Sequence, residues 1–157
     1  PGLIALMDDD AVPWTTRRQA ALTLGRLGPL ARDAVPHVTA RLNDVQADDP
    51  EASPQLWALG SLALFGTEGR DATPAVINLL EAETTQPLVR LACLNALSQF
   101  RNDRSTAALS RVLERRLGED ARSVDVELAV GAAEALGVVG AEAAAAVPVL
   151  MRAAQHH

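Results

Sequence analysis

The sequence contains no lysine, no tyrosine and only one cysteine, and these absences exclude several kinds of chemistry. Cys93 alone can form neither an intramolecular disulfide nor a cysteine-based zinc or iron-sulfur site. The 14 basic residues are all arginines, and together with 20 acidic residues they give a net charge of −6. Phosphate contacts need clustered positive charge, so we expect no nucleic-acid partner.

Aromatic residues and long hydrophobic runs are also scarce. Aromatics make up 3 % of the chain, and the longest apolar runs are short and rich in alanine, unlike a signal peptide or a membrane span. Hydrophobic residues make up 48 %, and heavy use of alanine suits closely packed helices better than sheets. We therefore expect an all-α protein with no membrane contact and no cofactor. The compartment stays open, with the cytoplasm slightly favoured.

The segment from Thr16 to Leu42 contains the unit that the rest of the chain repeats. Its apolar residues follow helical spacing twice, first at Ala20, Ala21, Leu24 and Leu27 and then at Ala34, Val35, Val38 and Leu42. Gly28 and Pro29 separate the two patterns, and Pro36 suits the first turn of the second helix. This arrangement predicts a helical hairpin.

Copies of this hairpin recur along the whole chain. The leucines at positions 24, 62, 97 and 136 lie 38, 35 and 39 residues apart. We predict repeats over 13–44, 54–83, 86–117 and 123–155, joined by an acidic linker (44–54) and a charged stretch (114–125). Residues 1–10 align with a second helix alone, so we expect an excised fragment of a longer array, with His156 and His157 as the stub of a purification tag.

The motif RRQAALTLGRLGP (17–29), followed by AVP (34–36), resembles a HEAT repeat, in particular the short bacterial kind first described in phycobilisome lyases. Thr16 replaces the valine that usually opens the motif, whereas Val89 and Arg90 keep the usual pair. The resemblance implies a right-handed α-solenoid of about four HEAT-like two-helix repeats, preceded by a half repeat. The motif residues pack helices, so the resemblance is specific for the fold and not for the function.

The resemblance also implies that the second helices line a concave face. Outward positions there are His37, Ala40 and Arg41, then Ala75, Asn78 and Glu81, then Arg111, Glu114 and Arg115, and finally Val149 and Arg152. Of these we take His37, Arg41, Asn78, Glu81, Arg111, Glu114, Arg115 and Arg152 as candidate partner-binding residues. The arginine excess favours an acidic peptide or protein segment.

Three functions are compatible with this face. The first is a non-enzymatic protein-interaction scaffold, for which we expect a monomer while the oligomeric state stays open. The second is a bilin lyase or a subunit of one, and the third is a structural spacer within a multidomain chain. The iron-dependent hydroxylases of similar repeat style require repeated His-Glu pairs, and the sequence contains none.

Each other candidate for chemistry has a simpler structural interpretation. We expect His37 to be a surface histidine without metal-ligand partners, and Cys93 to be a small buried residue in an alanine column. The acids Asp8 to Asp10 suit helix ends better than a cation site. Trp14 and Trp57 suit packing better than partner binding.

Two local contacts can also be predicted. Arg17 and Arg90 should hydrogen-bond to acids or carbonyls at the end of the preceding second helix, with Asp9 as the expected partner of Arg17. Asn102 and Asp103 should form a turn through their side chains, and Asp103 or Ser105 should cap the helix that follows.

Overall fold

A computed structural model describes residues 2–44, 53–116 and 123–155, and in these ranges the chain forms α-helices and short 3-10 helices without any strand. The predicted all-α class is confirmed. Most of the acidic linker (45–52), part of the charged stretch (117–122) and the terminal histidines (156–157) lie outside the described residues. The assignment of the helices to the four repeats stays a prediction.

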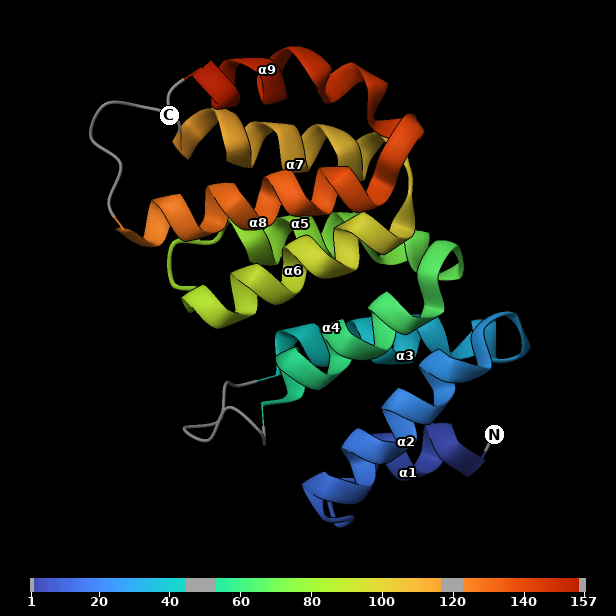
Figure 1. Cartoon of the computed structure of the whole chain (residues 1–157). Helices are drawn as coiled ribbons and strands as arrows, with labels where there is room; N and C mark the ends of the chain where they lie inside the picture. Colours follow the sequence, from blue (N-terminus) through green and yellow to red (C-terminus); the bar gives the residue numbers. More distant parts are fainter. Residues whose placement is uncertain (1, 45–52, 117–122, 156–157) are drawn as a thin grey trace.

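The α-helices form two columns (Figure 1). The first column contains α2 (Trp14–Leu27), α4 (Pro54–Phe65), α6 (Pro87–Phe100) and α8 (Ser123–Val139). The second column contains α1 (Gly2–Asp8), α3 (Val35–Ala40), α5 (Thr73–Glu81), α7 (Asp103–Arg116) and α9 (Val147–Gln155). Within the described ranges, four 3-10 helices extend or connect them: η1 (Gly28–Ala34), η2 (Arg41–Asn43), η4 (Gly66–Ala72) and η5 (Gly140–Ala146).

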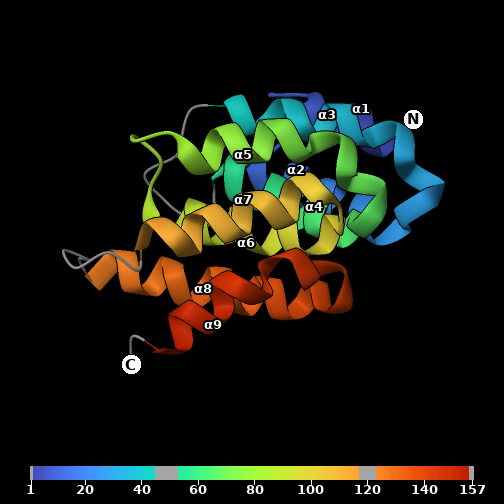
Figure 2. The same cartoon turned by 90° about the horizontal axis from the view of Figure 1, so that it is seen from above.

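Neighbouring layers of the stack are joined mainly through the first column. Helix α2 packs against α4, α4 against α6 and α6 against α8. Second-column helices pack against the first-column helix that follows them, as α5 does on α6 and α7 does on α8. Figures 1 and 2 show the same order from two directions, with the N-terminal and C-terminal helices at opposite ends. The chain is therefore a stack of helix pairs.

The repeated leucines form the centre of this stack. Leu24, Leu62, Leu97 and Leu136 are all buried, as their recurrence predicts. Trp57 and Cys93 are buried beside them, which confirms the packing role expected for both residues. Each leucine fills the space between successive layers, so the core continues through the stack.

Close contact between α2 and α4 depends on a glycine. A Cβ atom on Gly25 would lie 2.5 Å from the carbonyl oxygen of Ser61 and 2.9 Å from Cβ of Leu64. The hydroxyl of Ser61 donates a hydrogen bond of 2.5 Å back to the carbonyl of Ala21. Small residues at this position therefore let the helix backbones approach directly.

Left-handed backbone conformations end the first-column helices. Gly28, Gly66 and Gly140 have φ values of 53°, 58° and 71°, a region that glycine occupies without steric penalty. Arg101 takes the same role after α6 with φ 47°. The glycine turns were predicted, whereas the 3-10 helices that follow them were not. Proline and glycine in a sequence show where a helix ends, but they do not specify the backbone conformation that follows.

Two orientation predictions and one capping prediction are wrong. Leu27 was expected to face the core, but it is 41 % exposed. Phe100, at the equivalent position of α6, packs on Gly69 in the 3-10 turn of the layer before it. Among the described residues no such turn precedes α2, so Leu27 has nothing equivalent to pack on. Val149 is 3 % exposed instead of outward, because α9 packs against α7. The cap of α7 is Asn102, whose Oδ1 accepts a 2.9 Å hydrogen bond from the amide of Ser105.

The C-terminal layer contains a long apolar stretch. By length and composition, Val126–Ala153 could cross a membrane, which the sequence analysis did not anticipate. In the fold, this stretch is divided at Gly140, so that α8 and α9 form two helices instead of one continuous span. One third of its most apolar window is buried inside the molecule.

Candidate partner-binding surface

The predicted partner-binding residues lie along the second column of helices. His37, Asn78, Glu81, Arg111, Glu114, Arg115 and Arg152 are exposed, whereas Arg41 is partly buried. They come from α3, η2, α5, α7 and α9, so one edge of the stack presents them in order. Helices α5 and α7 contribute five of the eight.

Within the described residues, two ion pairs and one contact between a histidine and a carboxylate connect successive second-column helices along this edge. Nδ1 of His37 lies 2.8 Å from Asp8 of α1, Arg111 lies 3.3 Å from Glu81 of α5, and Arg152 lies 2.7 Å from Glu114 of α7. The sequence analysis treated Arg111 and Arg152 as available cations and missed their carboxylate partners. Because these partners are 30 and 38 positions away in the chain, spacing within one helix could not reveal them.

Arg41 has a mainly structural role. Its guanidinium lies 3.3 Å from Asp44 and 4.0 Å from Asp8, the carboxylate that also contacts His37. Asp8 therefore connects α1 with His37 of α3 and with Arg41 of η2. This explains why Arg41, unlike its neighbours on the edge, is partly withdrawn from solvent.

A groove lies between α5 and α7. It encloses about 310 Å³, and its lining consists of Pro74, Ile77, Asn78, Arg104, Ala107 and Arg111. We call it the α5/α7 groove. Its apolar residues come from both helices and its two arginines come from α7, so the groove exists only because these helices are adjacent. Asn78 and Arg111 were predicted from sequence, whereas Arg104 was missed because it lies about two helical turns before the chosen positions of α7.

A second hollow lies beside α3. It encloses about 630 Å³, and its lining is mixed in charge: Arg32, Asp33, Val35, Pro36, Thr39, Ala40, Asn43 and Asp71. Arg32 also lies 3.7 Å from Glu68 of η4, which links the two 3-10 turns across the layers. Carboxylates on both sides of this hollow make it less suited to an acidic ligand than the α5/α7 groove.

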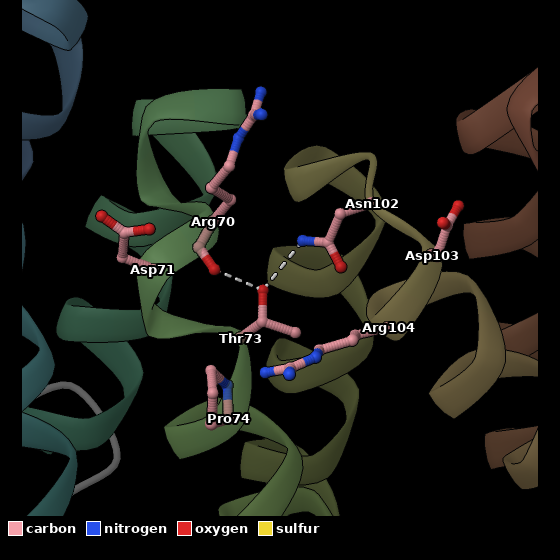
Figure 3. A pocket seen from close by; sticks show the side chains of 7 residues that line it. All are labelled: Arg70, Asp71, Thr73, Pro74, Asn102, Asp103 and Arg104. Atoms are coloured by element: carbon pink, nitrogen blue, oxygen red, sulfur yellow. Dashed lines mark hydrogen bonds between the residues drawn. The ribbon is translucent and has the colours of Figure 1, made fainter.

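A polar pocket of about 430 Å³ lies where α5 and α7 begin (Figure 3). The Thr73 hydroxyl donates a 2.6 Å hydrogen bond to the carbonyl of Arg70 and accepts one of 2.9 Å from Nδ2 of Asn102. Arg104 extends towards Thr73 and Pro74, whereas Asp71 points away from them. The central polar groups therefore satisfy one another, which favours a role in joining the layers.

Cys93 is buried in α6, and desolvation raises the pKa of its thiol to about 12, against a smaller opposing effect of Arg90. A thiol that stays protonated near neutral pH is a poor nucleophile. Arg90 itself donates hydrogen bonds of 2.8 Å and 3.3 Å to the carbonyls of Ala82 and Glu83, as its predicted structural role requires.

The acids Asp8 to Asp10 each have a partner within the protein. Asp8 contacts His37, Asp9 accepts a 2.9 Å hydrogen bond from the amide of Ala11, and Asp10 pairs with Arg17. Arg17 therefore contacts Asp10 instead of the expected Asp9. In the part of the chain that the structure describes, no three histidine, cysteine or acidic side chains gather as a metal site would require.

The stacked helix pairs, glycine turns and buried leucine column together match a known kind of repeat. A family model for HEAT repeats matches residues 45–127, which is more than half of the chain. The chain belongs to the HEAT-repeat family. Comparison with curated proteins found no match. HEAT repeats are typical of protein-interaction scaffolds, which are generally non-catalytic, and the match does not extend to the phycobilisome-lyase-like subtype.

Proposed function

We propose that this HEAT-repeat chain is a non-enzymatic scaffold that binds a protein partner through its second-column helices. In this proposal the stack is a right-handed α-solenoid, and the second column lines its concave face. The α5/α7 groove is the centre of the binding surface, and the candidate residues on neighbouring helices extend it.

The composition of the α5/α7 groove is the observation that carries the proposal. Pro74, Ile77 and Ala107 supply apolar contact area, and Asn78 supplies hydrogen-bonding groups. Arg104 and Arg111 are the charged residues of its lining, which includes no carboxylate, although the chain has a net charge of −6. The groove therefore suits a segment that carries a carboxylate next to an apolar side chain.

The ion pair between Arg111 and Glu81 does not prevent such binding. The pair is exposed, and exposed ion pairs contribute only about 0–1 kcal/mol. A carboxylate of the partner could replace Glu81 at little energetic expense. Arg104 lies at the groove and pairs with no carboxylate among the described residues, so it could bind the same partner directly.

A photo-crosslinking residue in place of the exposed Ala107 tests this proposal. In a cell extract it should capture one protein, and the crosslinked peptide should contain an aspartate or glutamate. The double variant Arg104→Glu/Arg111→Glu should reduce capture at least tenfold without a large change in melting temperature.

The matched control reverses charge elsewhere on the stack. Arg26→Glu changes an exposed residue of α2, in the first column, and should leave capture unchanged. Equal capture of the partner by the groove variant and by this control would exclude the α5/α7 groove as the binding site.

The bilin-lyase alternative rests on the repeat motif alone. Leu24, Gly28 and Pro36, which carry the motif, are used for packing and turns, so they give no information about a chromophore. Incubation with a bilin and an acceptor protein would distinguish it, because a lyase yields a covalent coloured product.

The alternative of a structural spacer predicts that no surface of this chain captures a specific protein partner.

A further inference from the structure

Three hollows lie next to one another along the second column of helices. The polar pocket at the start of α5 and α7 shares Asp71 with the hollow beside α3, and it shares Pro74 and Arg104 with the α5/α7 groove. Each shared side chain therefore lies on the rim between two hollows. Together the three hollows form one surface that crosses α3, α5 and α7, which we call the three-hollow surface.

The end of this surface beside α3 is negatively charged. Asp33 of η1 and Asp71 of η4 line the hollow, and both are exposed. In the part of the chain that the structure describes, neither forms an ion pair with a basic side chain. Arg32, the basic residue of this lining, lies 3.7 Å from Glu68. Because Glu68 offsets the charge of Arg32, the two aspartates determine the sign of the charge at this end.

The opposite end, the α5/α7 groove, is positively charged. The described residues of its lining include Arg104 and Arg111 and no carboxylate. Glu81 lies outside that lining and offsets the charge of Arg111 at 3.3 Å, whereas Arg104 keeps its full charge. The three-hollow surface therefore has opposite charges at its two ends.

The polar pocket between the two ends carries both signs of charge. Figure 3 shows Asp71 and Arg104 on either side of Thr73. The buried hydroxyl of Thr73 donates to the carbonyl of Arg70 and accepts from the amide of Asn102, at 2.6 Å and 2.9 Å. Since these central groups bind one another, a ligand is distinguished mainly by the charges at the two ends.

Apolar side chains continue along the same surface. Pro36 and Pro74 occupy equivalent positions in the first turns of α3 and α5, and both are exposed. Ile77 and Ala107 extend this contact area into the α5/α7 groove. Proline has no N–H group, so its ring offers apolar contact without a hydrogen-bond donor. A segment that lies across the surface therefore meets apolar side chains between the two charged ends.

We infer that the partner binds as one extended segment across the three-hollow surface, with a basic side chain beside Asp33 and Asp71 and a carboxylate beside Arg104 and Arg111. This inference rests on the proposed scaffold function and adds the chemistry and the orientation of the partner. Opposite charges at the two ends attract such a segment in one orientation and repel it in the reverse orientation. The basic residue of the partner lies towards the N-terminal layers and its acidic residue towards the C-terminal layers.

The distance between layers determines the spacing of the two charges in the partner. The hollow beside α3 and the α5/α7 groove lie on opposite sides of the layer that contains η4 and α5, so one helix layer separates them. Packed helices lie about 8–10 Å apart, and an extended chain advances about 3.3 Å per residue. The basic and acidic residues of the partner should therefore be about two to four positions apart.

A display library of short random peptides, selected on the full chain, tests the inference. Only peptides that fail to bind the Arg104→Glu/Arg111→Glu variant are retained, which restricts the set to ligands of the α5/α7 groove. These peptides should carry a lysine or arginine about two to four positions from an aspartate or glutamate. In fluorescence anisotropy, Asp33→Lys/Asp71→Lys should weaken their binding at least fivefold, and Asp33→Asn/Asp71→Asn should weaken it less.

A charge exchange in the peptide provides the rescue. When its basic residue is replaced by glutamate, the peptide should bind Asp33→Lys/Asp71→Lys at least fivefold more tightly than it binds the wild type. The matched control, Glu127→Lys/Glu134→Lys, makes the same change of charge at two exposed positions of α8 in the first column and should leave binding unchanged. Melting temperatures of the variants should stay close to that of the wild type, because the substituted side chains are exposed.

Two results would overturn the inference and leave the proposed function intact. One is a set of retained peptides without a basic residue, and the other is equal binding of these peptides to the wild type and to Asp33→Lys/Asp71→Lys. A library that yields no peptide dependent on Arg104 and Arg111 would instead overturn the proposed function of the groove together with the inference.

Discussion

At the scale of single residues, Cys93 shows how far burial controls chemistry in this fold. Its side chain projects from α6 into the core and is fully buried, and this removal from water raises the pKa of the thiol from 9.0 to about 12. The sequence contains neither lysine nor tyrosine, so few other side chains titrate in this interval. Alkaline titration of this protein therefore reports mainly on one thiol.

We predict that the free energy of unfolding falls between about pH 9 and pH 12. Below pH 9, the thiol is protonated in both states; above it, the thiol ionises in the unfolded chain while the folded chain keeps the proton. Ionisation then stabilises the unfolded state by up to about 1.4 kcal/mol per pH unit. Urea unfolding curves across this range measure the slope.

The Cys93→Ala variant is the matched control, because alanine occupies this column in other repeats. Its stability should be nearly independent of pH over the same interval. A slope equal to that of the wild type would show that another group is responsible.

At the scale of elements, the start of α7 depends on Asn102. Its Oδ1 accepts a hydrogen bond from the amide of Ser105, and its Nδ2 donates one to Thr73 at the start of α5, both 2.9 Å long. The hydroxyl of Ser105 in turn accepts from the amide of Asn102 at 3.2 Å. One residue thus caps a helix and joins two layers where the turn has no glycine.

Asn102→Ala should lower the free energy of unfolding by about 1–2 kcal/mol, since it removes a helix cap and a hydrogen bond between layers. Thermal or urea unfolding measures the difference. Asn95→Ala, at an exposed position inside α6, should change stability by no more than about 0.5 kcal/mol. Similar losses for the two variants would contradict the capping role.

The sequence predicts those elements whose cause is local. Periodic leucines and the glycines at 28, 66 and 140 identify the helices and their ends, because helical spacing and positive φ each require particular residues. The ion pair of Arg111 with Glu81 and the groove at Arg104 depend on which helices become neighbours. Three-dimensional proximity of that kind leaves no signal in the spacing along the chain.

At the scale of the whole molecule, stability depends on contacts between neighbouring layers. Helix α6 packs against both α4 and α8, whereas among the described helices α8 has one first-column neighbour, α6. In such a stack each layer is stabilised by its neighbours, so damage at the centre affects more of the chain than damage at the end.

We predict that Leu97→Ala and Leu136→Ala differ in the extent of their effects. Both remove a buried side chain and should destabilise by about 2–5 kcal/mol locally. Hydrogen exchange should show loss of protection from α4 to α9 in Leu97→Ala, but only in α8 and α9 in Leu136→Ala. Equal loss along the whole chain in both variants would indicate a single cooperative unit instead.

The two columns of the stack also differ mechanically. Buried leucines and the close approach at Gly25 hold the first-column helices together, whereas in the second column exposed ion pairs such as that of Glu114 with Arg152 add to buried contacts such as that of Val149. Salt screens exposed pairs and has little effect on buried apolar contacts. We therefore expect rising ionic strength to weaken contacts between second-column helices more than contacts between first-column helices, so that the curvature of the stack should change with salt.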